Sequence, residues 1–141
     1  VQVLGWMSAQ EIGATISRAR GLIMPSRYPE PFGLVAVEAA ASGLPIILPE
    51  SAFLAEEMRN LGFALTFEAG KPEAMRRAMM ELDRLPAREL RTMSKAAYEL
   101  AHGLFHRPEE WRDALLVSYV DLLRPQAGVI RAMPSRNGGC S

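Results

Sequence analysis

The sequence predicts an α/β fold in which helices flank a Rossmann-like parallel sheet, followed by a helical C-terminal segment. Short apolar stretches alternate with helical patterns through the first half of the chain. These stretches are continuously apolar, as is typical of parallel strands buried on both faces. The second half keeps only helical periodicity. We therefore expect one domain over residues 1–124, and a disordered tail over residues 125–141, where no periodicity remains.

The first three elements follow this alternation. Residues 1–5 (VQVLG) are short, apolar and rich in valine, and predict a strand. Ser8 and Glu11 have the spacing of a capping box, so a helix should begin after Ser8. Residues 21–24 (GLIM) predict a second buried strand, which ends at Pro25.

The next four elements complete the predicted sheet. Residues 34–42 predict a helix, and Gly43 stands where a left-handed residue often ends one. Residues 46–48 predict a third strand, residues 51–61 a helix and residues 63–67 a fourth strand.

Three further helices are expected, each with an apolar stripe. Pro72 and Pro108 can occupy the first turns of the first and last of them. The stripes consist of Met75, Ala78, Met79 and Leu82; of Leu90, Met93, Ala97, Ala101 and Leu104; and of Trp111, Leu115, Tyr119 and Leu122.

The composition excludes several function classes. The 141 residues carry 16 basic and 16 acidic side chains, and no clustered basic excess indicates a nucleic-acid partner. No apolar run approaches the roughly 20 residues of a transmembrane helix. The single cysteine, Cys140, excludes disulfides and cysteine metal sites, and a cytoplasmic location is expected. Because the sequence begins at Val1 within a predicted strand, we expect that part of the protein precedes it.

The stretch PSRYPEPFGLVAVEAAASGLP, from Pro25 to Pro45, joins the second predicted strand to a helix. Gly33 allows a sharp turn and a close approach of a ligand to the backbone. The amides near Gly33, Leu34 and Val35 lack intrahelical acceptors, and the positive end of the helix dipole adds to them. The junction therefore suits an anion such as phosphate. It also follows the carboxyl end of a strand, where open α/β sheets bind ligands.

Two acids flank this junction. Glu38, about one turn into the helix, can accept hydrogen bonds from vicinal hydroxyls, as on a ribose, and Glu30 can do the same for a sugar ring. A phosphate between two such acids describes a nucleotide sugar. The alternative is that a glutamate in a first helical turn only interacts favourably with the helix dipole. The spacing alone leaves both interpretations open.

At these residues the chain resembles the retaining glycosyltransferases of the GT-B architecture, which have two Rossmann-like halves (glycosyltransferase group 1, or family 4, type). The resemblance covers residues 1–49 and continues more loosely to Leu123. It implies the C-terminal, donor-binding half of such an enzyme, from bacterial glycan or glycolipid synthesis. The residues that carry it are Pro25-Ser26, Glu30-Pro31-Phe32-Gly33, Glu38 with seven residues between the two acids, and Val3-Leu4-Gly5-Trp6 upstream.

The resemblance implies a role for each matching residue. Glu30 is the candidate catalytic residue, at the hydroxyls of the transferred sugar. The implied donor-binding positions are Glu30 at the sugar, the Phe32 and Gly33 amides at the sugar and distal phosphate, the Leu34 and Val35 amides at the diphosphate, Glu38 at the ribose, and Gly5 and Trp6 beside the base.

The resemblance also implies partners. The substrate would be a UDP- or GDP-type nucleotide sugar, whose hexose moves to an acceptor with retention, and neither a metal nor a cofactor is expected. A missing N-terminal half would bind the acceptor and could contact a membrane surface. The second hypothesis is a non-catalytic fragment that binds nucleotide sugars. The third and less favoured one is a sugar-nucleotide epimerase of similar fold.

Two departures from the family pattern limit the expected activity. An Arg and a Lys that usually stabilise the leaving group lie upstream of the matching stretch and are not in this sequence, so the chain alone is not expected to catalyse transfer. The family's Gly-Gly turn after the third strand is replaced by residues 49–53 (PESAF). Arg18, Arg20 and Arg27 could meet phosphate, although solvated surface charge is the commoner role.

Overall fold

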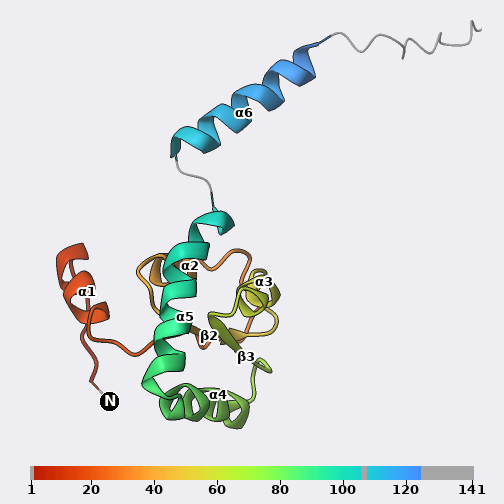
Figure 1. Ribbon diagram of the computed structural model, residues 1–141. Helices are drawn as coiled ribbons and strands as arrows, with labels where there is room; N and C mark the ends of the chain where they lie inside the picture. Colours follow the sequence, from red (N-terminus) through yellow and green to blue (C-terminus); the bar gives the residue numbers. More distant parts are fainter. Residues whose placement is uncertain (1, 106–107, 125–141) are drawn as a thin grey trace, which may run out of the picture. The chain divides into compact units, whose positions relative to one another are not determined.

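The computed structural model describes residues 2–105 and 108–124 (Figure 1). The chain divides into two compact units, residues 1–105 and residues 106–141, and each is described by itself. The first unit holds the sheet and the predicted site. The second holds helix α6 (Pro108–Leu123). The predicted tail over residues 125–141 lies outside the described residues, and the prediction of one domain over residues 1–124 stays a prediction.

Three parallel strands form the sheet of the first unit. They are β1 (Leu22–Ile23), β2 (Ile46–Pro49) and β3 (Ala64–Phe67), in the order β1-β2-β3. Leu22 pairs with Ile46, and Ile46 pairs in turn with Ala64. The predicted α/β fold with a parallel sheet is therefore confirmed. Because the strands are parallel, the loops that leave their carboxyl ends begin at one edge of the sheet.

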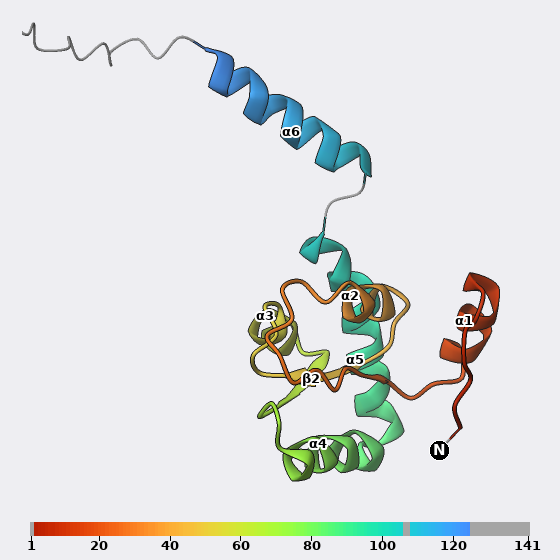
Figure 2. The ribbon, with the colours of Figure 1, turned by 180° about the vertical axis from the view of Figure 1, so that it is seen from behind.

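Helices cover both faces of this sheet. Figures 1 and 2 show α2 (Leu34–Ala41) and α3 (Ala55–Asn60) on one face and α4 (Pro72–Arg84) on the other. The α2 and α3 face carries the larger buried cluster, which includes Phe63 and Met58. The α4 face carries a smaller cluster of Ile47, Phe67, Ala78 and Leu82.

Helix α5 (Ala87–Leu100) and the short 3₁₀ helix η1 (Ala101–Leu104) link the two clusters. Leu90 and Met93 pack against the smaller cluster, whereas Ala97 and Ala101 are fully buried in the larger one. The Ser94 hydroxyl also donates a 2.6 Å hydrogen bond to the carbonyl of Gly43, at the end of α2. The apolar stripe predicted for this region therefore serves both sides of the sheet.

Helix α1 (Ala9–Ile16) begins with the predicted capping box. The Ser8 amide and hydroxyl donate to Glu11 Oε2 at 2.8 and 2.7 Å, and the Glu11 amide donates to Ser8 Oγ at 3.4 Å. The hydrogen bond from the Ser8 side chain, and then that from its backbone, lower the pKa of the Glu11 carboxyl from its usual value.

Two predicted elements are corrected by the structure. Residues 2–5 form no strand, and Val3 is 90% exposed. A strand needs a partner for its hydrogen-bond ladder, and in the described part of the chain none pairs with these residues. Helix α3 begins at Ala55 and not at residue 51, because the chain before it forms tight turns, in which the amides of Ala52 and Ala55 donate to the carbonyls of Pro49 and Ala52.

The start of β1 is packed tightly against α4 through Gly21. A Cβ atom at this position would lie 2.7 Å from Leu82 Cδ2 and 2.8 Å from the carbonyl oxygen of Pro45. Since side chains do not tolerate such distances, only glycine fits here without a shift of the backbone.

The neighbouring residue, Arg20, also contacts the end of α4. Its guanidinium donates to the carbonyls of Leu82, Asp83 and Leu85 at 3.1, 2.9 and 2.8 Å. These carbonyls lie at the end of α4, where carbonyls lack i+4 donors and where a cation interacts favourably with the helix dipole. Arg20 thus caps the end of α4 from an exposed position on the surface.

Replacing Gly21 by alanine is expected to lower the free energy of unfolding by about 1–3 kcal/mol, because the Pro45 carbonyl cannot move without disturbing β2. Urea unfolding measures the change. The matched control is Gly13→Ala within α1, where a Cβ atom would meet nothing within 4 Å. Alanine favours helices over glycine by about 0.5–1 kcal/mol, so the control should not lose stability. Equal losses in the two variants would contradict the packing described for Gly21.

Candidate functional site

The loop that leaves β1 at the carboxyl edge of the sheet carries Glu30. This residue is half-buried, and its carboxylate Oε2 accepts a hydrogen bond from the Ser26 hydroxyl at 3.4 Å. Its main-chain carbonyl accepts a 3.0 Å hydrogen bond from the amide of Phe53, in the loop that follows β2. Both the side chain and the backbone of Glu30 are thereby held in place.

Helix α2 begins at Gly33 in a left-handed conformation, with φ 76° and ψ 50°, and no side chain caps it. The Gly33 carbonyl accepts from the amides of Ala36 and Val37 at 2.9 and 3.2 Å, which starts the helical ladder. A Cβ atom at Gly33 would lie 3.4 Å from Glu30 Cγ and 3.5 Å from Met24 Cε. The Glu30 side chain therefore lies against the first turn of α2.

Four consecutive amides lead into this helix with no partner. Among the described residues, no acceptor receives a hydrogen bond from the N–H groups of Phe32, Gly33, Leu34 or Val35. Leu34 is 64% exposed and Val35 is 59% exposed, whereas Gly33 is buried, so solvent or a ligand can reach the first turn of the helix. Free amides at the positive end of a helix dipole form a site suited to an anion.

Glu38 lies on the exposed side of α2, one turn after Leu34. The opposite side packs into the larger cluster through Ala36, Val37 and Ala40, none of which is more than 3% exposed. Within residues 2–105 and 108–124, no hydrogen bond or ion pair engages the Glu38 carboxylate. The carboxylate can therefore accept hydrogen bonds from a ligand that sits at the start of the helix.

Gly5 and Trp6 precede α1 and belong to a different part of the chain. No atom lies within 4 Å of the position that a Cβ would take at Gly5, and Trp6 is 92% exposed. The structure therefore groups the residues from Glu30 to Glu38 at one helix start, whereas a role for Gly5 and Trp6 beside a base stays a prediction.

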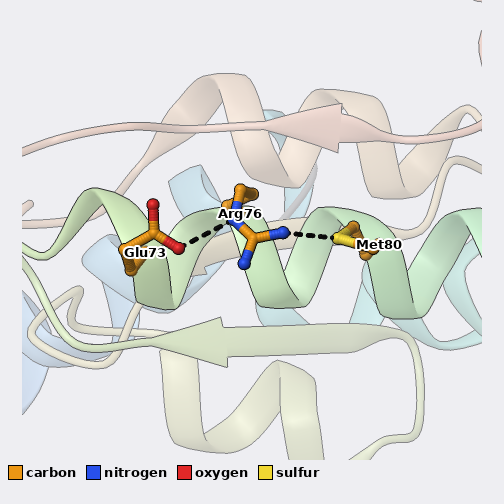
Figure 3. A network of polar contacts seen from close by, with 3 residues as sticks. All are labelled: Glu73, Arg76 and Met80. Carbon is orange, nitrogen blue, oxygen red and sulfur yellow. Dashed lines mark hydrogen bonds and ion pairs between the residues drawn. The ribbon is translucent and has the colours of Figure 1, made fainter.

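Two basic residues, Arg27 and Lys71, follow the carboxyl ends of β1 and β3. Arg27, on the same loop, lines a hollow of about 190 Å³ together with Lys71, which precedes α4. Arg76 is engaged within α4, where its guanidinium donates at 2.8 Å both to Glu73 Oε2 and to Met80 Sδ (Figure 3). Arg27 and Lys71 are thus the cations nearest in sequence to the carboxyl edge of the sheet.

In the described ranges, no cluster of three or more His, Cys, Asp or Glu side chains could hold a metal ion. None of the helices described there is both long and apolar enough to span a bilayer.

Comparison with known proteins identifies the family. Residues 1–100 match the sequence profile described as glycosyl transferases group 1. The chain belongs to this family. The family that the motif indicated is thereby confirmed.

Curated relatives of the chain include several glycosyltransferases. It is 36% identical over 112 residues to a D-inositol 3-phosphate glycosyltransferase of Mycobacterium avium, covering 79% of this chain and 26% of that protein. Over 57 residues, 40% of this chain, it is 42% identical to a glycogen synthase of Mycobacterium tuberculosis. It covers 14% of that synthase.

A solved structure resembles the fold. The chain matches sucrose-phosphate synthase from Thermosynechococcus elongatus with a TM-score of 0.74 and 27% sequence identity. The match covers 87% of this chain and 31% of the synthase. The chain thus spans less than a third of each of these proteins.

Two residues of the site had no role from sequence reasoning. Ser26 belongs to the motif that carries the resemblance, and Phe53 belongs to the segment that departs from the family pattern. Ser26 and Glu30 are four positions apart in the sequence, which is a weak signal for a contact within a loop. The bond between Phe53 and Glu30 joins residues far apart in the sequence, so no local pattern reveals it.

The left-handed start of α2 can be tested by Gly33→Ala. Since an L-residue costs about 1–2 kcal/mol in this conformation, the free energy of unfolding should fall by that amount in a urea titration. Gly62→Ala is the matched control, because Gly62 also has a positive φ, of 82°, and has nothing within 4 Å of its Cβ position. The left-handed start would be contradicted if Gly33→Ala lost less than about 0.5 kcal/mol of unfolding free energy while Gly62→Ala lost about 1–2 kcal/mol.

Proposed function

We propose that the chain is the donor-binding part of a glycosyltransferase that moves a hexose from a UDP- or GDP-type nucleotide sugar to an acceptor, with retention of configuration. The observation that carries this proposal is the run of four free amides from Phe32 to Val35, with Glu30 before it and Glu38 one turn after it. Membership in glycosyl transferases group 1 supports the same reaction class.

In the proposed complex, the diphosphate accepts hydrogen bonds from the amides of Leu34 and Val35. The amides of Phe32 and Gly33 bind the distal phosphate and the sugar. Fixed amide dipoles at the positive end of α2 also stabilise the negative charge that develops on the departing diphosphate. The site needs no metal ion or cofactor for this step.

The two acids recognise different hydroxylated groups. Glu30 accepts hydrogen bonds from the transferred hexose and is the proposed catalytic residue. The hydrogen bond from Ser26 helps to fix its orientation. Glu38 accepts hydrogen bonds from the ribose, since its carboxylate faces away from the buried side of α2. We place the base beside Gly5 and Trp6.

We further propose that the rest of a longer, cytoplasmic protein supplies the acceptor-binding half, basic groups for the leaving diphosphate and any contact with a membrane surface. The inositol phosphate glycosyltransferase and the glycogen synthase that resemble this chain carry different product or acceptor names, so they indicate no single acceptor.

A second candidate function is nucleotide-sugar binding without turnover. It is favoured by the engagement of two arginines elsewhere, because Arg20 caps the end of α4 and Arg76 binds Glu73 and Met80. A donor hydrolysis assay separates the two candidates. Membership in glycosyl transferases group 1 gives no support to the third alternative, an epimerase.

The proposed split of roles predicts different losses for Glu38→Ala and Glu30→Ala. Hydrogen bonds to a charged group contribute about 1.5–3 kcal/mol, so Glu38→Ala should weaken the binding of UDP or GDP by about tenfold or more in calorimetric titration. Glu30→Ala should leave free nucleotide binding unchanged, yet weaken nucleotide-sugar binding by a similar factor.

Glu89→Ala, an exposed acid on α5, is the control and should match the wild type with every ligand. Equal losses with free nucleotide for the Glu30 and Glu38 variants would contradict the split of roles. A folded wild-type chain that binds no nucleotide would overturn the proposed function.

A further inference from the structure

The loop that follows β2 carries an exposed aromatic residue, Phe53, whose backbone contacts the backbone of Glu30. Its backbone is fixed on both sides, because Ala52 and Leu54 are buried at 6% and 5% exposure and the Ala52 amide donates to the Pro49 carbonyl. Between these two anchors, the amide of Phe53 donates to the carbonyl of Glu30 at 3.0 Å, while its side chain is 72% exposed. The main chain of an exposed phenylalanine is thus hydrogen-bonded to the main chain of the proposed sugar-binding acid.

Exposure alone does not argue for a role, since single apolar side chains on a surface are ordinary. Here the position adds a second argument. The amide of Phe53 is bonded to the main chain of Glu30, so the backbone that carries the ring lies next to the backbone that carries the acid. Tyr28 and Phe32, at 82% and 36% exposure, stand two residues before and after Glu30 on the facing loop. Aromatic side chains therefore accompany this acid on both loops of the sheet edge.

The chemistry of a hexose ring fits such surroundings. A hexopyranosyl group has hydroxyls around its rim and C–H bonds on its faces. The rim suits a carboxylate acceptor, whereas partly positive C–H bonds are attracted to the negative face of an aromatic ring. A carboxylate and a phenyl ring on adjacent loops can together bind both parts of one sugar.

We infer that Phe53 stacks on the transferred hexose and selects nucleotide sugars over free nucleotides. The inference rests on the proposed function, because it places the hexose at Glu30. Phe53 is a specificity-determining residue in this account, whereas the start of α2 binds the diphosphate common to both kinds of ligand.

The test compares Phe53→Ala, Phe53→Leu and Phe53→Tyr with the wild type, by calorimetric titration with UDP-glucose and GDP-mannose and with free UDP and GDP. Aromatic contacts contribute roughly 0.5–1.5 kcal/mol, so Phe53→Ala should lower the affinity for the nucleotide sugar by about 2- to 12-fold. Free nucleotide binding should not change. Phe53→Leu should resemble Phe53→Ala, and Phe53→Tyr should resemble the wild type.

Tyr98→Ala is the matched control, since Tyr98 is a 61% exposed aromatic residue on α5. It should bind every ligand as the wild type does. The midpoint of urea unfolding should be the same in all Phe53 variants, because an exposed ring contributes little to folding.

Two outcomes would overturn the inference while leaving the proposed function in place. One is a Phe53→Ala variant that binds nucleotide sugars as the wild type does, although Glu30→Ala weakens them. The other is a Phe53→Leu variant equal to the wild type, which would mean that bulk and not the ring matters. A wild-type chain that binds no nucleotide at all would instead overturn the proposed function, and this inference with it.

Discussion

The left-handed start of α2 at Gly33 is the constraint on which the rest of the site depends. A positive φ of 76° turns the chain sharply out of the loop and directs it into a helix that no side chain caps. The amides from Phe32 to Val35 are therefore left without acceptors at the positive end of the helix. The Glu30 side chain lies against this turn, with its Cγ 3.4 Å from the position that a Cβ would take at Gly33. One glycine conformation thus sets the helix start at which the free amides and Glu30 lie together.

The surrounding fold keeps this helix start in place. The alanine-rich side of α2 is buried against the sheet, which fixes the axis of the helix and leaves Glu38 on the open side. Ser94 of α5 holds the other end of α2 through the Gly43 carbonyl. At the carboxyl edge, the bond between Phe53 and Glu30 ties the loop after β2 to the loop after β1. Strand order, helix packing and loop contacts therefore converge on one edge of the sheet, as is usual for ligand sites in open α/β folds.

Much of this arrangement could be predicted from local sequence. The three strands, the capping box of α1, and the glycine and free amides at the start of α2 all follow from short-range patterns that the structure bears out. What failed depends on contacts distant in sequence. Residues 2–5 have the composition of a strand but no partner among the described residues.

Two further features needed the fold as well. The bond from the Phe53 amide to the Glu30 carbonyl joins two loops that no local pattern connects. Arg20 looked like a surface charge, yet it caps α4 through carbonyls more than 60 residues away in sequence. Tertiary hydrogen bonds of this kind leave no periodic signal.

The central claim is that the free amides at the start of α2 bind the diphosphate of a nucleotide sugar. Amide NMR of the whole chain during titration with UDP tests it most directly. The account predicts that the largest chemical-shift changes occur at the amides of Gly33, Leu34 and Val35, with a single saturating affinity. Saturable shifts centred instead on Arg27 and Lys71, with the α2 amides unchanged, would contradict it.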